Sequence, residues 1–296
     1  NIENLTDTDI KWADYVFISG MIVQKESALK IIEHVKKFEK PVAAGGPLFT
    51  TGSEDFQMVD NLFLGEAEHT LFDFIKDIEK GTTKKIYQAQ DFPEITSVPV
   101  PDWKLINIFK YHSMCLQYSR GCPFNCEFCD VVILNGRTPR TKIKEQVIAE
   151  LDALYELGWH SGVFFVDDNL IGNKLKLKKE ILPAIIEWQE KKKHPFTFNT
   201  QVSINLTDDE ELIKLLVDAG FTTVFIGIET PDEKSLEECS KFHNKNRDLV
   251  SGIKKLQNFG LEVQGGFIVG FDSDTPSIFQ RQVEFIQKSG IVTAMV

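Results

Sequence analysis

The stretch SMCLQYSRGCPFNCEFCD at residues 113–130 joins a short apolar run to a loop that holds most of the sulfur in the chain. The apolar run predicts a β-strand, and the Gly and Pro residues after it predict a loop. Three of the five cysteines lie in this loop, at Cys122, Cys126 and Cys129, with the spacing C-x3-C-x2-C. A disulfide framework would spread an even number of cysteines along the chain, so this clustering indicates reduced thiols that act as ligands.

Downstream of the loop, apolar runs alternate with segments of helical periodicity. Runs that are apolar on both faces are typical of parallel strands buried under helices. Six strands, each but the last followed by a helix, predict an α/β fold with a partial (β/α)6 barrel over residues 112–296. Functional side chains of such a fold lie at the carboxyl ends of the strands. The predicted strands cover residues 113–119, 162–168, 196–204, 222–229, 261–270 and 291–296. The predicted helices cover residues 144–158, 176–193, 208–220, 247–260 and 276–290.

Two of the helix starts carry capping-box patterns. Thr207 is followed three residues later by Glu210, and Thr230 by Glu233. In a capping box the first hydroxyl accepts a hydrogen bond from a backbone N–H of the first turn. We therefore expect Thr207 and Thr230 to cap their helices, the second with Pro231 at the first helical position.

Residues 1–81 predict a smaller α/β unit ahead of the barrel. Apolar runs begin at Tyr15, Pro41 and Asn61, and helical patterns follow the first and the third of them. This alternation implies a parallel sheet with helices on its faces. Residues 82–111 contain several prolines and little periodicity, so they predict a linker.

The two ends of the chain lead us to expect a fragment of a longer protein. The sequence lacks an initiator Met and stops in SGIVTAMV, which resembles a strand without a tail. On this reading the barrel is cut at its sixth strand and the unit of residues 1–81 is truncated.

The composition argues against several classes of partner. Thirty-three Lys and Arg against forty-four Asp and Glu give a net charge of −11, which disfavours binding to nucleic acid or to an anionic membrane. No apolar run approaches the roughly 18 residues that a transmembrane segment needs, and the first residues lack a signal-peptide pattern. With the clustered thiols, these features lead us to expect a cytoplasmic protein that acts on a small molecule or another protein.

The residues alone leave three interpretations of the cysteine loop open. Structural zinc takes four ligands in a closed shell, so His112, Cys115 or a remote group would have to complete it. A cubane iron–sulfur cluster ordinarily uses four cysteines, so three of them would leave one iron open to a substrate or cofactor. The third interpretation is unliganded thiols.

With Phe128 directly before the last cysteine, the loop resembles the signature of the radical SAM superfamily. The resemblance implies that Cys122, Cys126 and Cys129 hold a 4Fe–4S cluster, whose fourth iron is chelated by the amino and carboxylate groups of S-adenosylmethionine. An electron from the reduced cluster would cleave the sulfonium C–S bond, giving methionine and a 5′-deoxyadenosyl radical that abstracts hydrogen from the substrate. A flavodoxin or ferredoxin-type reductant would supply the electron.

The same resemblance implies S-adenosylmethionine contacts at the ends of the later strands. VDDN stands where the family usually has Gly-Gly-Glu, and TQVSIN and FIGIETP offer amide, hydroxyl and carboxylate groups. GGFIVG fits the family's G-x-I-x-G pattern without its trailing Glu. With Phe128, the implied cofactor-binding residues are Asp167, Asp168, Gln201, Ser203, Glu229, Gly266, Ile268 and Gly270.

Simpler explanations of these residues stay open. Asp167 and Asp168 would also suit a helix N-terminus, and polar strand ends are often only solvated. Arg120 either stabilises the anionic cluster or the cofactor carboxylate, or forms a surface salt bridge.

Residues 15–81 resemble the later part of a flavodoxin-like cobalamin-binding domain. The resemblance rests on FISGM, AAGGP and LGEAEHTL, and it implies cobalamin contacts at Ser19, Gly45, Gly46, Gly65 and Glu66. The motif D-x-H-x-x-G, whose His ligates cobalt in that domain, is absent. Either the chain begins after it, or cobalamin binds without a protein ligand, or the unit is a docking module without a cofactor.

As a whole, the chain resembles cobalamin-domain radical SAM proteins akin to hopanoid C-2 methylases. The resemblance implies methylation of an unactivated carbon in a small, lipid-like or other, substrate. The carbon radical would take a methyl group from methylcobalamin, which a second S-adenosylmethionine would regenerate. Two alternatives remain: a non-methylating radical SAM enzyme for rearrangement or ring contraction, and a non-enzymatic iron–sulfur or zinc protein.

Overall fold

The computed structural model describes residues 5–296, which fall into two compact units. The first unit runs to Glu94 and includes Ile133–Asn135. The second comprises Ile95–Val132 and Gly136–Val296. Each unit has its own sheet and its own buried core.

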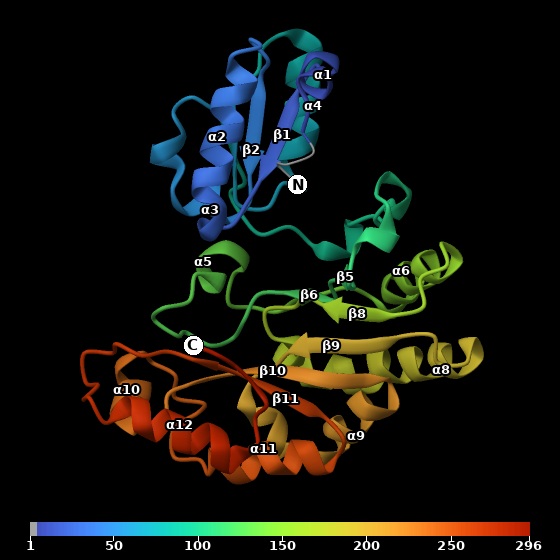
Figure 1. Cartoon of the computed structure of the whole chain (residues 1–296). Coiled ribbons are helices and arrows are strands. Elements are labelled where there is room, and N and C mark those ends of the chain that lie inside the picture. Colours follow the sequence, from blue (N-terminus) through green and yellow to red (C-terminus); the bar gives the residue numbers. More distant parts are fainter. Residues whose placement is uncertain (1–4) are drawn as a thin grey trace. The chain divides into compact units, whose positions relative to one another are not determined.

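The first unit, as far as the structure describes it, is built on four parallel strands in the order β1-β2-β3-β4; β1 and β2 are labelled beside α2 in Figure 1. Alternate residues of β2 face opposite sides: Val42 and Ala44 pack in one core with Ile32 of α2, and Ala43 packs in another with Phe74 of α4. Helices therefore cover both faces of this sheet, as the sequence predicts. The elements are α1 (Asp7–Trp12), β1 (Val16–Ser19), η2 (Ile22–Gln24), α2 (Lys25–Lys36), β2 (Val42–Gly45), α3 (Pro47–Thr51), η3 (Ser53–Phe56), β3 (Asn61–Leu64), α4 (Thr70–Lys80) and β4 (Ile86–Gln88).

The boundary between the units differs from the expected linker. Residues 86–88 form β4, which pairs with β3, so the first unit continues to Glu94 and does not end at residue 81. Tyr87 is the residue that holds this strand in the core, where it stacks on Phe63 at 5.3 Å between ring centroids. A strand of three residues with one buried side chain is too short to show periodicity.

The second unit is built on six parallel strands in the order β12-β11-β10-β9-β8-β5, counted within the described residues. This arrangement confirms the predicted parallel sheet and is consistent with a partial barrel. The longest strand, β10, pairs on one side with β9 and on the other with β11. The strands of this sheet are β5 (Met114–Leu116), β8 (Gly162–Phe165), β9 (Thr197–Gln201), β10 (Phe221–Glu229), β11 (Glu262–Phe267) and β12 (Thr293–Met295).

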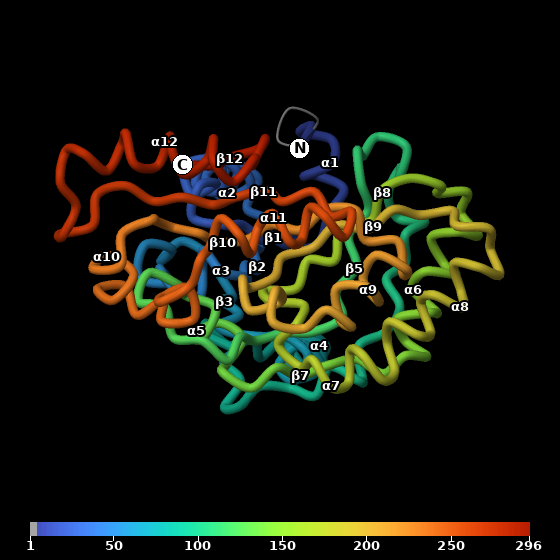
Figure 2. The backbone as a smooth tube through the Cα atoms, turned by 90° about the horizontal axis from the view of Figure 1, so that it is seen from below, coloured from blue at the N-terminus to red at the C-terminus, as the bar shows by residue number. Residues whose placement is uncertain are grey.

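Helices follow the strands and pack against one another as a layer along the sheet (Figures 1 and 2). Helix α8 lies between α6 and α9, and α11 packs against α12. No helix among the described residues is long and apolar enough to span a membrane. The helices are α6 (Lys144–Glu156), α7 (Lys174–Lys176), η8 (Leu177–Ile181), α8 (Leu182–Lys192), α9 (Glu210–Asp218), α10 (Glu233–Glu238), α11 (Leu249–Asn258) and α12 (Ile278–Ser289). Helix α5 (Val131–Asn135) spans the boundary, since Ile133–Asn135 belong to the first unit. Short helical turns are η4 (Ile95–Ser97), η5 (Trp103–Leu105), η6 (Ile108–Lys110), η7 (Leu170–Asn173) and η9 (Ile204–Asp208).

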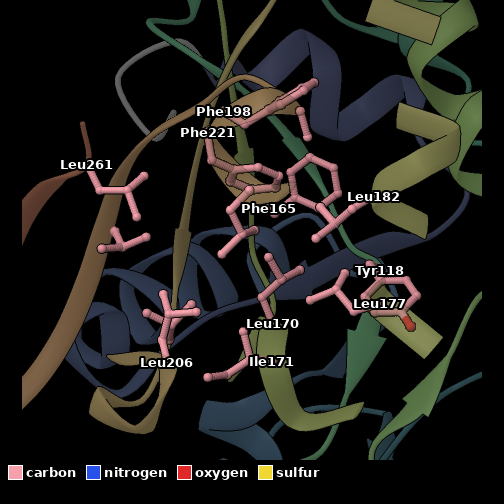
Figure 3. Packing of buried hydrophobic residues seen from close by; sticks show 14 of the residues in the cluster. Tyr118, Phe165, Leu170, Ile171, Leu177, Leu182, Phe198, Leu206, Phe221 and Leu261 are labelled. Carbon is pink, nitrogen blue, oxygen red and sulfur yellow. The ribbon is translucent and has the colours of Figure 1, made fainter. Parts of the chain in front are cut away.

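The core between this sheet and its helices is rich in aromatic rings (Figure 3). Phe165, Phe198 and Phe221 come from three neighbouring strands, and their ring centroids lie 5.2–5.3 Å apart. Tilted and edge-to-face contacts of this kind add to the stabilisation from burial. The rigid core fixes the carboxyl ends of β8, β9 and β10, where the candidate site lies.

The two predicted Thr caps are wrong. Asp209 caps α9 by accepting from the backbone of Leu212, and Asp232 caps α10 by accepting from Lys234 and Ser235. A carboxylate at this position accepts hydrogen bonds and also interacts favourably with the helix dipole, so each Asp takes the place of the Thr two residues before it.

Candidate active site

The cysteine loop, Gly121–Pro139, begins and ends at a narrow neck in the second unit. Ser119 and Arg120 (β6) pair antiparallel with Arg140 and Thr141 (β7). The backbone N–H of Cys122 also donates to the carbonyl of Gly136 at 3.2 Å across the loop. The loop is therefore closed at its base, and its start is held in place.

The two acids after β8 hold this neck. Asp167 is fully buried, and its carboxylate accepts from the backbone N–H of Tyr118 at 3.0 Å and from both the N–H and the hydroxyl of Ser119. Asp168 accepts from the backbone N–H of Gly121 at 3.2 Å. Burial raises the pKa of Asp167 to about 7, although the surrounding donors favour its charged form. The pair thus ties the end of β8 to the entry of the cysteine loop.

A single cavity of about 350 Å³ opens beside the loop, at the carboxyl ends of β9 and β10. It collects residues from the cysteine loop, from the ends of β8, β9 and β10, and from the segment after α10. Its lining is Cys122, Phe124, Cys126, Phe128, Cys129, Val131, Asp168, Asn169, Gln201, Val202, Ser203, Phe225, Gly227, Glu229, Lys241 and His243.

Most of the site residues that the sequence singles out in the second unit meet in this cavity. They are Cys122, Cys126, Cys129, Phe128, Asp168, Gln201, Ser203 and Glu229. Asp167 does not line it, because its carboxylate is turned to the neck.

The G-x-I-x-G stretch lies behind the cavity. A Cβ on Gly266 would lie 2.7 Å from the ring of Phe225, which does line the cavity, so Gly266 leaves room for that ring. The N–H of Ile268 donates to the carbonyl of Glu229 at 2.8 Å, and Gly270 has a φ of +106°. Arg120 donates from Nε to Gln117 at 2.8 Å and does not line the cavity.

Glu229 and Lys241 form a buried ion pair in the cavity wall. Glu229 is 7% exposed and Lys241 8% exposed, and their charged groups are hydrogen-bonded. Lys241 Nζ also lies 5.6 Å from the ring centroid of Phe128. A Cβ on Gly227 would lie 2.6 Å from Lys241 Nζ, so Gly at this position leaves the space that the pair occupies. The wall therefore presents one anionic and one cationic group beside the thiols.

The pKa values of Cys122, Cys126 and His243 are shifted toward the neutral forms of these side chains. Burial raises the pKa of Cys122 and raises that of Cys126 to about 11, where the charge of Lys241 acts in the opposite direction. Burial and the nearby cations lower the pKa of His243 to about 4, so its ring is neutral and stacks on Phe124 at 3.8 Å between centroids. Neutral thiols must lose their protons when a metal binds.

The donor set fits a cluster better than a single ion. Within residues 5–296, no three His, Cys, Asp or Glu side chains are placed to hold one metal ion. A structural zinc ion needs four ligands that converge on one point, whereas the cysteines of a cubane cluster each bind a different iron and stand apart around it. The three thiols line the same cavity, as the ligands of one cubane cluster would.

The first unit has a cavity of about 300 Å³ at the carboxyl ends of β1, β2 and β3. Ser19, Gly45, Gly46 and Gly65 line it, and Glu66 does not. Gly46 has a φ of +90°, and a Cβ there would lie 2.6 Å from Ser19 Oγ. The absence of a side chain at Gly46 thus leaves space at this edge of the sheet, where a ligand could approach the backbone closely.

Three further polar residues of the main cavity lie outside the set of cofactor-binding residues that the sequence implies. Lys241 and His243 lie in the polar segment after α10, which has no periodicity to mark them. Asn169 follows the two acids after β8, and its amide is bonded to Ser203 through both the Nδ2 and the Oδ1 atoms. The VDDN stretch includes Asn169 among the polar residues after this strand, but its sequence does not say which of the three enters the cavity.

Comparison with known proteins agrees with this geometry. Residues 116–286 match the family described as the Radical SAM superfamily. An uncharacterized methyltransferase of Synechocystis sp. is 45% identical over 99% of this chain and 55% of its own length. The hopanoid C-2 methylase of Rhodopseudomonas palustris is 36% identical over 98% of this chain and 56% of that protein. The chain thus spans about half the length of the curated relatives it matches.

A solved structure shows the same fold. The cobalamin-dependent S-adenosylmethionine radical enzyme OxsB, with aqua-cobalamin bound, matches 100% of this chain and 47% of its own at a TM-score of 0.79 and 18% identity. At that identity the likeness concerns the fold alone. Because the family match covers more than half of the residues and falls on the cavity described above, the chain belongs to the radical SAM superfamily.

Proposed function

We propose that this chain is the catalytic core of a cobalamin-dependent radical SAM methyltransferase that methylates an unactivated carbon of a small molecule. The observation that carries the proposal is the single cavity in which Cys122, Cys126 and Cys129 meet the polar ends of β8, β9 and β10. The relatives named as methyltransferases, and the cobalamin-bound enzyme of the same fold, support it.

In this proposal the three cysteines hold a 4Fe–4S cluster. When reduced, such a cluster supplies the electron that cleaves S-adenosylmethionine to methionine and a 5′-deoxyadenosyl radical. Asp168, Gln201 and Ser203 offer a carboxylate, an amide and a hydroxyl to the polar groups of the cofactor. The ion pair of Glu229 and Lys241 offers one charge of each sign, which suits a cofactor that is itself a zwitterion.

The glycine-lined cavity of the first unit would receive cobalamin, the carrier of the methyl group. Its backbone can approach a ligand closely because Gly45, Gly46 and Gly65 carry no side chain. Ser19 Oγ provides a hydrogen-bonding group at the same edge.

The remaining parts of the proposal concern the surroundings of the reaction. The substrate is a small molecule, including a lipid-like one, and a flavodoxin or ferredoxin-type protein delivers the electron. We place the activity in the cytoplasm, because three clustered thiols need a reducing compartment to stay free for iron.

Anaerobic reconstitution with iron and sulfide tests the central claim. After reduction and addition of S-adenosylmethionine, mass spectrometry should detect 5′-deoxyadenosine from the parent protein and none from Cys126→Ala. Cys239→Ala is the matched control, because Cys239 is a buried thiol that does not line the cavity. Product from Cys126→Ala, or zinc in place of iron in the protein as isolated, would overturn the proposal.

Cobalamin binding needs its own test. The parent protein, incubated with hydroxocobalamin and passed through a desalting column, should retain the visible absorbance of the bound cofactor. Cleavage of S-adenosylmethionine without cobalamin retention would instead favour a non-methylating radical SAM enzyme.

A further inference from the structure

A buried asparagine lies directly under the end of β10. Asn244 is fully buried in the segment after α10. Its Nδ2 donates to the carbonyl of Gly227 at 3.0 Å and to that of Ile228 at 3.1 Å. Within residues 5–296, its Oδ1 has no hydrogen-bond partner. The side chain therefore acts as a two-pronged donor to the last carbonyls before Glu229.

The backbone at this point is held in an unfavourable shape. Glu229 has a φ of +64°, a backbone conformation that residues other than Gly rarely adopt. The register of β10 against β11 also shifts between Gly227 and Glu229. A residue in this region keeps such a conformation only when its surroundings enforce it.

The strained backbone at Gly227–Glu229, called the turn below, has a direct consequence for the cavity. Strand residues normally alternate between the two faces of a sheet, and the shift at Gly227 changes which way the next side chains point. Glu229 is in the cavity wall and bonded to Lys241. Relaxing the turn would move its carboxylate and release Lys241 from its partner.

We propose that Asn244 is a positioning residue, which holds the end of β10 so that the Glu229 carboxylate faces the S-adenosylmethionine cavity. Asn244 does not line that cavity and acts through Glu229. The inference deepens the proposed function and rests on it for the identity of the ligand. The geometric claim about Glu229 stands on the contacts alone.

The chain contains a matched control for a merely structural role. Gln189 of α8 is also fully buried, and its Nε2 donates to the carbonyls of Phe196 at 2.8 Å and Ala219 at 3.2 Å. Its Oε1 likewise has no partner among the described residues. Phe196 and Ala219 precede β9 and β10, at the opposite end of the sheet from the cavity.

The experiment compares Asn244→Ala with Gln189→Ala in the reconstituted full chain. Equilibrium dialysis measures the Kd for S-adenosylmethionine, and hydrogen exchange with mass spectrometry follows the peptide of residues 225–232. Both variants should lose stability, since each removes a buried amide with two hydrogen bonds. Only Asn244→Ala should speed hydrogen exchange in residues 225–232. Only this variant should also raise the Kd for S-adenosylmethionine, by about tenfold, as expected for the loss of one to two hydrogen bonds.

A second background shows whether Asn244 acts through Glu229. In Glu229→Gln the carboxylate is already absent, so adding Asn244→Ala should change the Kd little beyond the single variant. Full additivity of the two effects, or equal Kd values for Asn244→Ala and Gln189→Ala, would overturn the proposal. If Asn244→Ala does not fold, Asn244→Ser and Gln189→Ser, which keep a neutral hydroxyl donor, make the same comparison.

The failures of the two proposals can be told apart. If the parent protein holds its cluster but binds no S-adenosylmethionine, the proposed function fails. The exchange data then still decide the role of Asn244, because unchanged exchange in residues 225–232 would show that it does not hold the turn.

Discussion

Lys142 and Glu150 form an ion pair that is buried at the foot of the cysteine loop, and breaking it from one side should be costly. The side chains are 5% and 2% exposed. Lys142 directly follows β7, and its N–H donates to the carbonyl of Tyr118 at 2.9 Å. Lys142→Met keeps the apolar stem but leaves the Glu150 carboxylate in the core without its counter-charge. We expect a loss of about 3–5 kcal/mol in the free energy of unfolding.

Urea titrations provide the measurement. Three of the four tryptophans, Trp103, Trp159 and Trp188, lie in the second unit. The fourth, Trp12, is already 84% exposed in the folded protein, so the change in tryptophan fluorescence follows mainly the unfolding of the second unit. With a denaturant slope of about 2–3 kcal/mol per molar, the expected loss moves the urea midpoint by about 1–2.5 M. Lys144→Met is the control, because Lys144 is exposed, lies 3.9 Å from Glu145, and should change stability little.

The pH dependence sharpens this test. Burial raises the pKa of Glu150 even with Lys142 present, and removing Lys142 takes away the group that opposes the shift. In Lys142→Met, the native state therefore holds the Glu150 proton more tightly than the unfolded state does. The contribution of Glu150 to stability is then fully present below its pKa in the unfolded chain and is lost as the pH rises through its pKa in the folded protein. The difference in stability between the parent and Lys142→Met should therefore be smallest in acid. Equal stabilities of Lys142→Met and Lys144→Met at neutral pH would refute this reasoning.

Three further substitutions test other parts of the molecule. Asp167→Asn should remove a pH dependence of the free energy of unfolding, because burial raises the pKa of Asp167 to about 7 in the folded protein. As the pH rises from about 4 to 7, the stability of the parent should fall relative to that of the variant. Urea titrations across that range measure this difference. Gly227→Ala should weaken the dialysis Kd for S-adenosylmethionine by about tenfold or more, because its Cβ would lie 2.6 Å from Lys241 Nζ; a parent-like Kd would contradict this. Gly46→Ala should reduce retained cobalamin absorbance, because φ is +90° and its Cβ would lie 2.6 Å from Ser19 Oγ; full retention would count against that cavity.

The sequence predicts the barrel strands and the residues at their ends well. Each strand of the second sheet begins and ends inside its predicted range or within one residue of it. Apolar runs between amphipathic helices can only be buried as parallel strands, whose carboxyl ends share one edge. Asp168, Gln201, Ser203 and Glu229 meet in one cavity for that reason.

Which side chains complete the cavity could not be predicted. Lys241 and Asn244 lie in CSKFHNKNRD, a polar run that is typical of a solvated loop. Both are buried, because the loop returns over the end of β10 and their polar groups pair with Glu229 and with backbone carbonyls. That return path depends on tertiary packing and leaves no local pattern.

The sequence also does not distinguish the roles of neighbouring residues with the same chemistry. Asp167 and Asp168 follow the same strand, yet one carboxylate is turned to the neck of the loop and the other lines the cavity. Likewise the capping-box pattern marks Thr230, whereas Asp232 caps α10, because both side chains suit a cap and only the backbone path decides between them.

The pairing of β6 with β7 fixes the two ends of the cysteine loop independently of the residues between them. Pairing of Ser119 with Thr141 and of Arg120 with Arg140 fixes the separation of the loop ends, whatever lies between them. The entropy of closing a loop grows only slowly with its length, by roughly 0.6 kcal/mol for each doubling. Loops of different length could therefore be exchanged at this neck while the sheet stays intact, which makes the neck a natural junction for grafting new cluster-binding segments onto this scaffold.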